Sequence, residues 1–152
     1  MFTIRVYGIL INEQKQVLVS DEYILGNFYT KFGGGGLELG EGTLDCLKRE
    51  FLEEMNLSVD VLEHIYTTDF FQQSAFNPEQ QIISIYYLVK ALEVITAPLR
   101  KTPFAFDEAQ LQFIKNGQAV ETFRFINWND FSPTSVSLPI DKVVAAIIKE
   151  KY

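Results

Sequence analysis

Hydrophobic and polar positions in the first third of the chain follow the pattern of β-strands. Residues 2–11 and 16–20 are rich in valine, isoleucine and tyrosine, and a polar segment separates them. This pattern predicts two strands joined as a hairpin. An aromatic run over residues 28–32 predicts a third strand. Six of the nine glycines then fall between Gly33 and Gly42, which predicts a loop under backbone constraint.

A helical pattern follows the glycines. Leu44 to Met55 is predicted as an amphipathic helix, with Thr43 as its N-cap and a buried stripe that begins at Leu44. The remaining predicted elements are strands over 59–67 and 82–92, a short helix over 106–115, a strand over 121–128 and a helix over 140–149 that Pro139 opens. The strand over 82–92 is nearly all apolar, so we expect it to be central. Together these elements predict a layered α/β arrangement in one domain over residues 1–152.

Composition and charge exclude several classes of protein. Twenty acidic residues against 13 basic ones give a net charge of −7, which argues against a protein that binds long nucleic acids through a basic surface. The single cysteine, Cys46, excludes an internal disulfide and a cysteine-based zinc site. The first residues do not resemble a signal peptide, and no apolar run reaches the roughly 18 residues of a spanning helix. We therefore expect a cytoplasmic protein without a membrane partner.

Three glutamates of the predicted helix form the strongest chemical signal. Glu50, Glu53 and Glu54 fall within an arc of about 100° on a helical wheel. Such runs are usually solvated faces, but each like-charge pair here costs about 0.2–0.5 kcal/mol, and the helix dipole disfavours anions in this half of the helix. Only Arg49 can relieve the repulsion. A bound Mg²⁺ or Mn²⁺ ion explains the cluster better, because these hard ions prefer oxygen ligands.

The glycine-rich stretch before the helix does not fit the common phosphate-binding motifs. Gly35 and Gly40 have the spacing of a P-loop, but Glu41 occupies the lysine position. The glycines instead indicate main chain that a metal or a phosphate can approach closely. The lone His64 lies on a predicted strand and more often has a structural role, so zinc is disfavoured.

The segment from Gly35 to Leu57 reads GGLELGEGTLDCLKREFLEEMNL and closely resembles the Nudix box. All the charged positions of that signature are present at its spacing, namely Glu41, Arg49, Glu50, Glu53 and Glu54. Asn56 replaces the final glycine. Since asparagine tolerates the left-handed conformation that this helix end requires, we expect a cost of at most about 1 kcal/mol.

The resemblance implies a Nudix-type α/β/α sandwich with a mixed sheet and a metal-dependent hydrolase. The substrates of the family are nucleoside diphosphates linked to another moiety, such as nucleoside triphosphates, nucleotide sugars or ADP-ribose. By carry-over, Mg²⁺ or Mn²⁺ would be bound by the three glutamates and by the main-chain carbonyl of Gly35 or a neighbour. Glu41 and Arg49 would hold those glutamates in position. Dimers are common in the family, which leaves a homodimer open.

The general base and the substrate are less well defined by the sequence. Glu50 and Glu53 are candidates for the general base. Glu121 is a third candidate, because it begins the predicted strand that ends at Trp128, and a glutamate shortly before such a tryptophan resembles the family's downstream pattern. An exposed strand position explains Glu121 equally well. Arg5 and Lys31 are candidates for phosphate contacts, although each also fits a solvated surface base. Aromatic residues that could stack a base are Tyr7, Phe28, Tyr29 and those of the loop over 70–76.

Two other functions stay open at this point. A Nudix-like module that binds or senses a nucleotide without cleaving it usually belongs to a larger protein and often lacks box carboxylates, whereas this chain has them all. A family member that isomerises a diphosphate would ordinarily use a cysteine or further acids in its pocket. Residues 35–57 alone carry six acids and two bases, so much of the negative charge lies at the predicted metal site. The preferred prediction is a hydrolase of a small phosphate anhydride.

Overall fold

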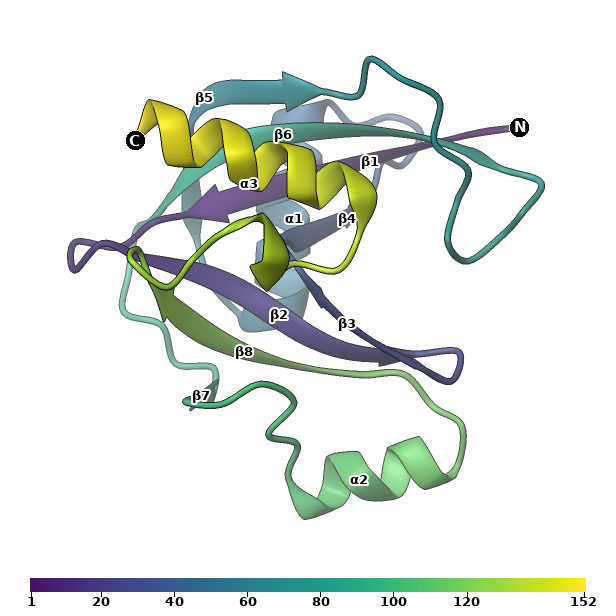
Figure 1. Ribbon diagram of the computed structural model, residues 1–152, viewed down its shortest axis with the longest axis vertical. Coiled ribbons are helices and arrows are strands. Elements are labelled where there is room, and N and C mark those ends of the chain that lie inside the picture. Colours follow the sequence, from purple (N-terminus) through teal and green to yellow (C-terminus); the bar gives the residue numbers. More distant parts are fainter.

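The computed structural model describes residues 1–152 and contains eight strands, three α-helices and one short 3-10 helix (Figure 1). The elements are β1 (Phe2–Leu10), β2 (Gln16–Ile24), β3 (Asn27–Lys31), β4 (Gly33–Gly36), α1 (Thr43–Met55), β5 (Val59–Thr67), β6 (Gln81–Ala91), β7 (Leu99–Arg100), α2 (Glu108–Lys115), β8 (Val120–Asn127), the 3-10 helix η1 (Pro133–Ser135) and α3 (Pro139–Lys151). None of the helices is both long and apolar enough to cross a membrane.

The strands form two mixed sheets. The first has the order β4-β1-β6-β5, with β1 parallel to β6 and antiparallel to β4. The second has the order β3-β2-β8-β7, with β2 antiparallel to both of its neighbours. The apolar strand predicted over 82–92 corresponds to β6, and its central place in the first sheet is confirmed. The mixed α/β class is confirmed as well.

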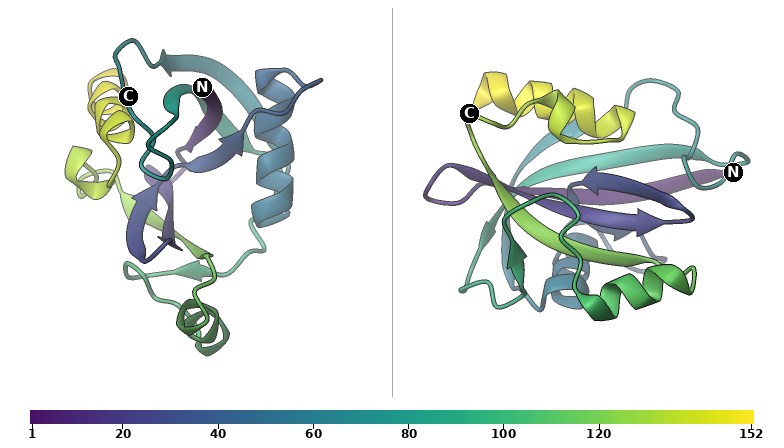
Figure 2. Two further views of the ribbon diagram at one scale, coloured as in Figure 1. Left: turned by 90° about the vertical axis from the view of Figure 1, so that its right-hand side faces the viewer. Right: turned by 60° about the horizontal axis from the view of Figure 1, so that its bottom comes forward.

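Helices cover both faces of the first sheet, as Figure 1 and Figure 2 show. Alternate residues of β1 belong to different hydrophobic cores, because successive side chains of a strand point to opposite faces. Val6 and Leu10 pack with the buried side of α1, whereas Tyr7 and Ile9 pack with the buried side of α3. The first sheet is therefore the middle layer of the sandwich, and both of its faces are buried by helices.

The glycine-rich stretch corrects the predicted loop over 33–42. Its first part, Gly33–Gly36, is the edge strand β4 and pairs antiparallel with β1, so that Gly35 lies opposite Val6. Glycine usually weakens a strand, which is why the sequence indicated a loop. Here it permits a close approach, since a Cβ on Gly34 would overlap the carbonyl oxygen of Val6. Gly34 also has φ of +147°, a value that L-residues rarely adopt.

The two ends of α1 give one correction and one confirmation. Thr43 is not the N-cap: Gly42 has that position without a side-chain bond, and the Thr43 hydroxyl instead lies 2.8 Å from the Tyr87 hydroxyl. The Thr43 side chain therefore contacts β6 and does not cap its own helix. At the other end, Asn56 has φ of 50° and ψ of 41°, which confirms the predicted left-handed conformation.

Candidate active site

Helix α1 is oriented by the residues it buries. Cys46, Leu47, Phe51 and Met55 pack against the first sheet, and the ring of Phe51 lies directly over Gly8 and Gly33. The predicted stripe was wrong at its first residue, because Leu44 is 46% exposed and Cys46 is buried instead. Burial raises the pKa of the Cys46 thiol to about 12, which excludes it as a nucleophile at neutral pH.

Glu50 lies directly against the glycine strand. A Cβ on Gly35 would overlap the carboxylate of Glu50, so only glycine leaves room for that carboxylate beside the main chain. The Glu50 side chain is 13% exposed. Two of the predicted metal ligands, the Glu50 carboxylate and the main chain of Gly35, are thus brought together by the fold.

Arg49 connects the other charged residues of the box. Its guanidinium donates to both carboxylate oxygens of Glu41, at 3.0 and 2.7 Å, and to Glu50 and Glu53 at 3.0 and 3.2 Å. It also donates to the carbonyl oxygen of Gly36 at 3.1 Å. The hydrogen bonds from Arg49 lower the pKa of Glu41 to about 2. This geometry has the form expected for Glu41 and Arg49 as residues that orient the glutamates.

Glu54 and Glu121 meet where α1 faces the second sheet. Burial and the charges of neighbouring carboxylates raise the pKa of both side chains. One of those neighbours is Glu22, which the pairing of β2 with β8 places directly opposite Glu121. Like charges opposite each other on adjacent strands are unfavourable. Glu121 is therefore a partly buried member of an acidic group (Glu22, Glu50, Glu54, Glu121).

Sequence reasoning missed Glu22. Nothing in its local pattern separates it from an exposed strand residue, and only the strand register brings it to the site. By contrast Glu53, a predicted ligand, has a side chain that is 58% exposed and held by Arg49. As they stand, no three acidic side chains surround a common point at ligand distance.

The residues of this group nevertheless fit a divalent cation. The available donors are carboxylate and main-chain oxygens, the set that Mg²⁺ and Mn²⁺ prefer. Burial, and after it the charges of neighbouring carboxylates, raises the pKa of Glu54 and Glu121, and a nearby bound cation would favour their ionised forms. The absence of a side chain at Gly35 supplies the space beside Glu50.

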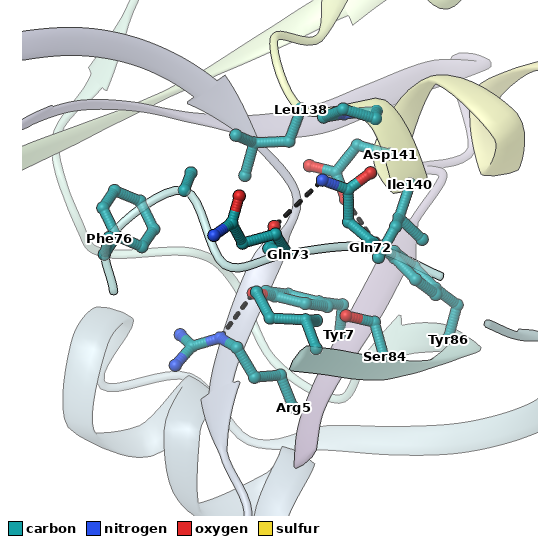
Figure 3. A pocket seen from close by; sticks show the side chains of 13 residues that line it. Arg5, Tyr7, Gln72, Gln73, Phe76, Ser84, Tyr86, Leu138, Ile140 and Asp141 are labelled. Carbon is teal, nitrogen blue, oxygen red and sulfur yellow. Dashed lines mark hydrogen bonds between the residues drawn. The ribbon is translucent and has the colours of Figure 1, made fainter. Parts of the chain in front are cut away.

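A separate pocket lies on the other face of β1, between β6, the loop over 68–80 and the first turn of α3 (Figure 3). It contains about 420 Å³ of empty space, part of it open to solvent. Tyr7, Phe76 and Tyr86 contribute aromatic walls, and Gln72 and Gln73 contribute amides. Of the predicted stacking residues, Tyr7 and Phe76 line the pocket, and Tyr29 packs on Phe76 with ring centres 5.4 Å apart.

Three of the aromatic candidates, Phe28, Phe70 and Phe71, do not line this pocket. Phe28 packs instead against Phe104, with ring centres 5.5 Å apart, and Phe71 is 72% exposed. The remote position of Phe28 follows from the period of the strand, because Phe28 and Tyr29 point to opposite faces of β3. The set of stacking candidates therefore reduces to Tyr7, Tyr29 and Phe76.

Asp141, in the first turn of α3, is the most unusual residue of the pocket. Its Oδ1 accepts a hydrogen bond of 2.5 Å from the Tyr86 hydroxyl, whereas its Oδ2 is buried without a partner. Burial raises the pKa of Asp141 to about 6. Sequence reasoning missed this residue because the pattern of the helix indicates an apolar face and no site. The available signal was an acid between Ile140 and Val144 on that face.

Comparison with known proteins identifies the architecture. The sequence model for the NUDIX domain matches residues 1–142. The chain belongs to the Nudix family. No curated protein matches the sequence, so the identification rests on this domain match, on the complete box and on the fold.

Solved structures of Nudix proteins share the fold at low sequence identity. A NUDIX hydrolase from Nitrosomonas europaea is 13% identical, with a TM-score of 0.68 over 99% of this chain and 90% of that one. A MutT protein from Methanosarcina mazei Go1 is 11% identical, with a TM-score of 0.66 over 99% and 94%. An ADP-ribose pyrophosphatase from Streptococcus suis is 13% identical, with a TM-score of 0.56 over 94% and 88%.

These comparisons confirm the predicted family and the mixed α/β sandwich. They also support the prediction that the chain is a Nudix hydrolase acting on pyrophosphate bonds. Enzymes of the Nudix family generally use divalent metal ions and act on small nucleotide derivatives, a chemistry that agrees with the oxygen-rich acidic group beside β4.

Proposed function

We propose that this Nudix protein cleaves the diphosphate linkage of a small nucleoside diphosphate derivative with Mg²⁺ or Mn²⁺. The observation that carries the proposal is the Glu50 carboxylate packed on Gly35, beside the partly buried Glu54 and Glu121. A protein with a net charge of −7 repels an anionic substrate unless cations reverse the charge locally. The proposed ligands would hold such a cation at one place.

The residues have distinct proposed roles. Glu50, Glu53, Glu54 and the Gly35 carbonyl hold the metal, which when bound neutralises phosphate oxygens and activates water. Arg49 holds the carboxylates of Glu50 and Glu53 in position through its hydrogen bonds to them, and Glu41 holds Arg49 in turn. A charge-assisted network of this kind limits the conformations that the ligands sample.

Glu121 is our candidate for the general base. Burial and the carboxylate of Glu22 raise its pKa from the ordinary value, and a raised carboxylate pKa makes a better proton acceptor near neutral pH. Its partner in the buried pair, Glu54, lies on α1. We expect Glu121→Gln to reduce kcat by about 10²-fold or more while metal affinity changes little. A rate equal to that of the wild type would remove Glu121 from the mechanism.

The pocket beside Tyr7 is proposed to hold the nucleoside half of the substrate. Aromatic walls suit a planar base. The unpartnered Oδ2 of Asp141 would accept a hydrogen bond from an amino or ring N–H group, which nucleobases offer. Two structural neighbours carry the names ADP-ribose pyrophosphatase and UDP-X diphosphatase, and both kinds of substrate contain such a base.

A substrate panel with a matched pair of variants tests the proposed function. Nucleoside triphosphates, nucleotide sugars and ADP-ribose are each incubated with Mg²⁺ and, separately, with EDTA, and the products are quantified by chromatography. We expect turnover of at least one compound with Mg²⁺. Removal of the metal by EDTA and the substitution Glu53→Gln should each abolish that turnover. Glu13→Gln, in the exposed turn after β1, changes the charge equally and should retain activity. Tight binding of one compound without turnover of any would favour the nucleotide-sensing alternative.

A further inference from the structure

The Tyr7 side chain is contacted by two cationic groups. The guanidinium of Arg5 lies 5.6 Å from the centre of the Tyr7 ring, and the ammonium of Lys31 lies 5.8 Å from it. Arg5 Nε also donates to the Tyr7 hydroxyl at 2.6 Å. Two cations on one ring repel each other, and the charges of Glu22 and Glu50 nearby offset part of that repulsion.

Lys31 is almost fully buried, with a side chain that is 6% exposed. Its only ion-pair partner is Glu22, and the distance of 3.5 Å between Nζ and Oε2 is longer than that of a good charge-assisted hydrogen bond. An ammonium carries three donors. With Glu22 as its one partner at this distance, the Lys31 ammonium has donors available for a further acceptor.

Arg5 has unused donors as well. Only its Nε is bonded within the protein, to a neutral phenol, and Figure 3 shows the terminal nitrogens of the guanidinium pointing away from Tyr7. On the neighbouring strand β4, Gly36 lies opposite Arg5. A Cβ there would only touch Nη1 at 3.8 Å, so the small residue leaves this side of the guanidinium open.

The two cations lie close to residues of both the pocket and the acidic group. Arg5 lines the pocket, and its charge interacts with those of Glu50 and Glu22. Lys31 forms its ion pair with Glu22, and its charge also interacts with that of Asp141 in the pocket. A ligand that extends from the pocket to the acidic group therefore passes Arg5 and Lys31.

We propose that Arg5 and Lys31, oriented by Tyr7, form an oxyanion site outside the Nudix box for the phosphate next to the nucleoside. The metal held at the acidic group would then bind the neighbouring phosphate. The nature of the ligand rests on the proposed function, but the site itself rests on the geometry of three side chains. Its role is to position the substrate, and it operates without the metal.

Binding in the absence of metal tests the site directly. The full chain is titrated in EDTA with AMP, with GMP and with adenosine and guanosine, which lack the phosphate, and binding is followed by calorimetry and NMR. We expect the wild type to bind each monophosphate at least about tenfold more tightly than its nucleoside. Arg5→Met and Lys31→Met should each remove most of that difference, because they lower the affinity for the monophosphate much more than the affinity for the nucleoside. Lys101→Met, in an exposed loop, is the matched control and should bind like the wild type.

Three further variants separate a binding role from a merely structural one. Arg5→Lys and Lys31→Arg keep the charge and should recover part of the preference for monophosphates. Tyr7→Phe removes only the acceptor of Arg5 Nε and should weaken monophosphate binding by a smaller factor, with a circular dichroism spectrum like that of the wild type. If the charge-preserving variants bind no better than the methionine variants, the charges do not contact phosphate and the proposal fails.

The outcome is independent of catalysis. Equal affinity for monophosphate and nucleoside in the wild type, or unchanged preference in both methionine variants, overturns the oxyanion site even if the chain hydrolyses its substrate. A phosphate preference that Arg5→Met and Lys31→Met abolish supports the site even if no substrate of the panel is cleaved.

Discussion

Helices α1 and α2 differ in where their stability comes from. Helix α2 begins with a complete capping box between Asp107 and Gln110 and ends with Lys115, yet it buries no residue. In Figure 1 it stands apart from α1 and α3. Helix α1 has no side-chain cap and no basic residue in its last turn. It buries four residues instead.

This difference indicates that α1 has a lower intrinsic helix stability because it carries the acidic residues of the candidate site. The acids of α1 repel one another and oppose the helix dipole, which lowers the intrinsic stability of that helix. Tertiary packing of Phe51 and its neighbours compensates. Helix α2 has no such cluster to support, and its local signals suffice. A helix that violates the local rules and is nevertheless anchored in the core is a candidate for function.

The largest expected effect comes from removing the anchor of α1. Phe51→Ala should lower the free energy of unfolding by about 3–5 kcal/mol, because the buried ring packs over Gly8 and leaves a cavity. Phe113→Ala on α2 removes the same side chain from a position that is 48% exposed and should cost less than about 1 kcal/mol. Urea denaturation measures both. Similar losses in the two variants would contradict the contrast between the helices.

A smaller effect is expected at the start of α3, where Asp141 is buried. Its folded pKa of about 6 lies above the ordinary value of 3.8, so the native state binds more protons than the unfolded state between these values. The stability of the wild type should therefore fall as pH rises through this window, by roughly 3 kcal/mol from this group. Asp141→Asn cannot titrate, so its stability relative to the wild type should improve by that amount between pH 4 and pH 7. Parallel stability profiles in urea denaturation would refute the assignment.

The cap of α2 should contribute about 1 kcal/mol. Asp107→Ala removes the acceptor of the Gln110 N–H bond, 2.8 Å long, and should increase hydrogen exchange along α2 while activity stays the same. Asp107→Asn retains the cap but loses the ion pair with Arg100, so it should stay close to the wild type. If the asparagine variant exchanged as fast as the alanine variant, the ion pair rather than the cap would hold the helix.

The smallest effect has the opposite sign and concerns the end of α1. Asn56 has φ of 50°, so Asn56→Gly should stabilise the protein by up to about 1 kcal/mol, and Asn56→Ala should destabilise it. Thermal denaturation of the three proteins gives the order. Destabilisation by glycine would show that the asparagine side chain makes a contribution beyond its backbone conformation.

The sequence was most informative where chemistry and spacing coincide within one element. Glu50, Glu53 and Glu54 are identified by their positions on one helix, and the apolar strand at β6 by its composition. The structure was required for contacts that depend on register or on packing between elements. Glu22 joins the site only because β2 pairs with β8, and β4 forms only because its glycines fit against β1. Asp141 and Lys31 are seen as buried charges only once α3 and β3 are in place.

The central claim is that the unfavourable acids of α1 exist to hold a divalent cation. Mn²⁺ binding measured by electron paramagnetic resonance, with Mg²⁺ as competitor, tests it most directly. We predict saturable binding in the wild type that Mg²⁺ displaces and that the double variant Glu50→Gln, Glu54→Gln loses, whereas Glu13→Gln retains it. Equal Mn²⁺ affinity in the wild type and the double variant would contradict the claim, because the ion would then bind elsewhere than at these acids.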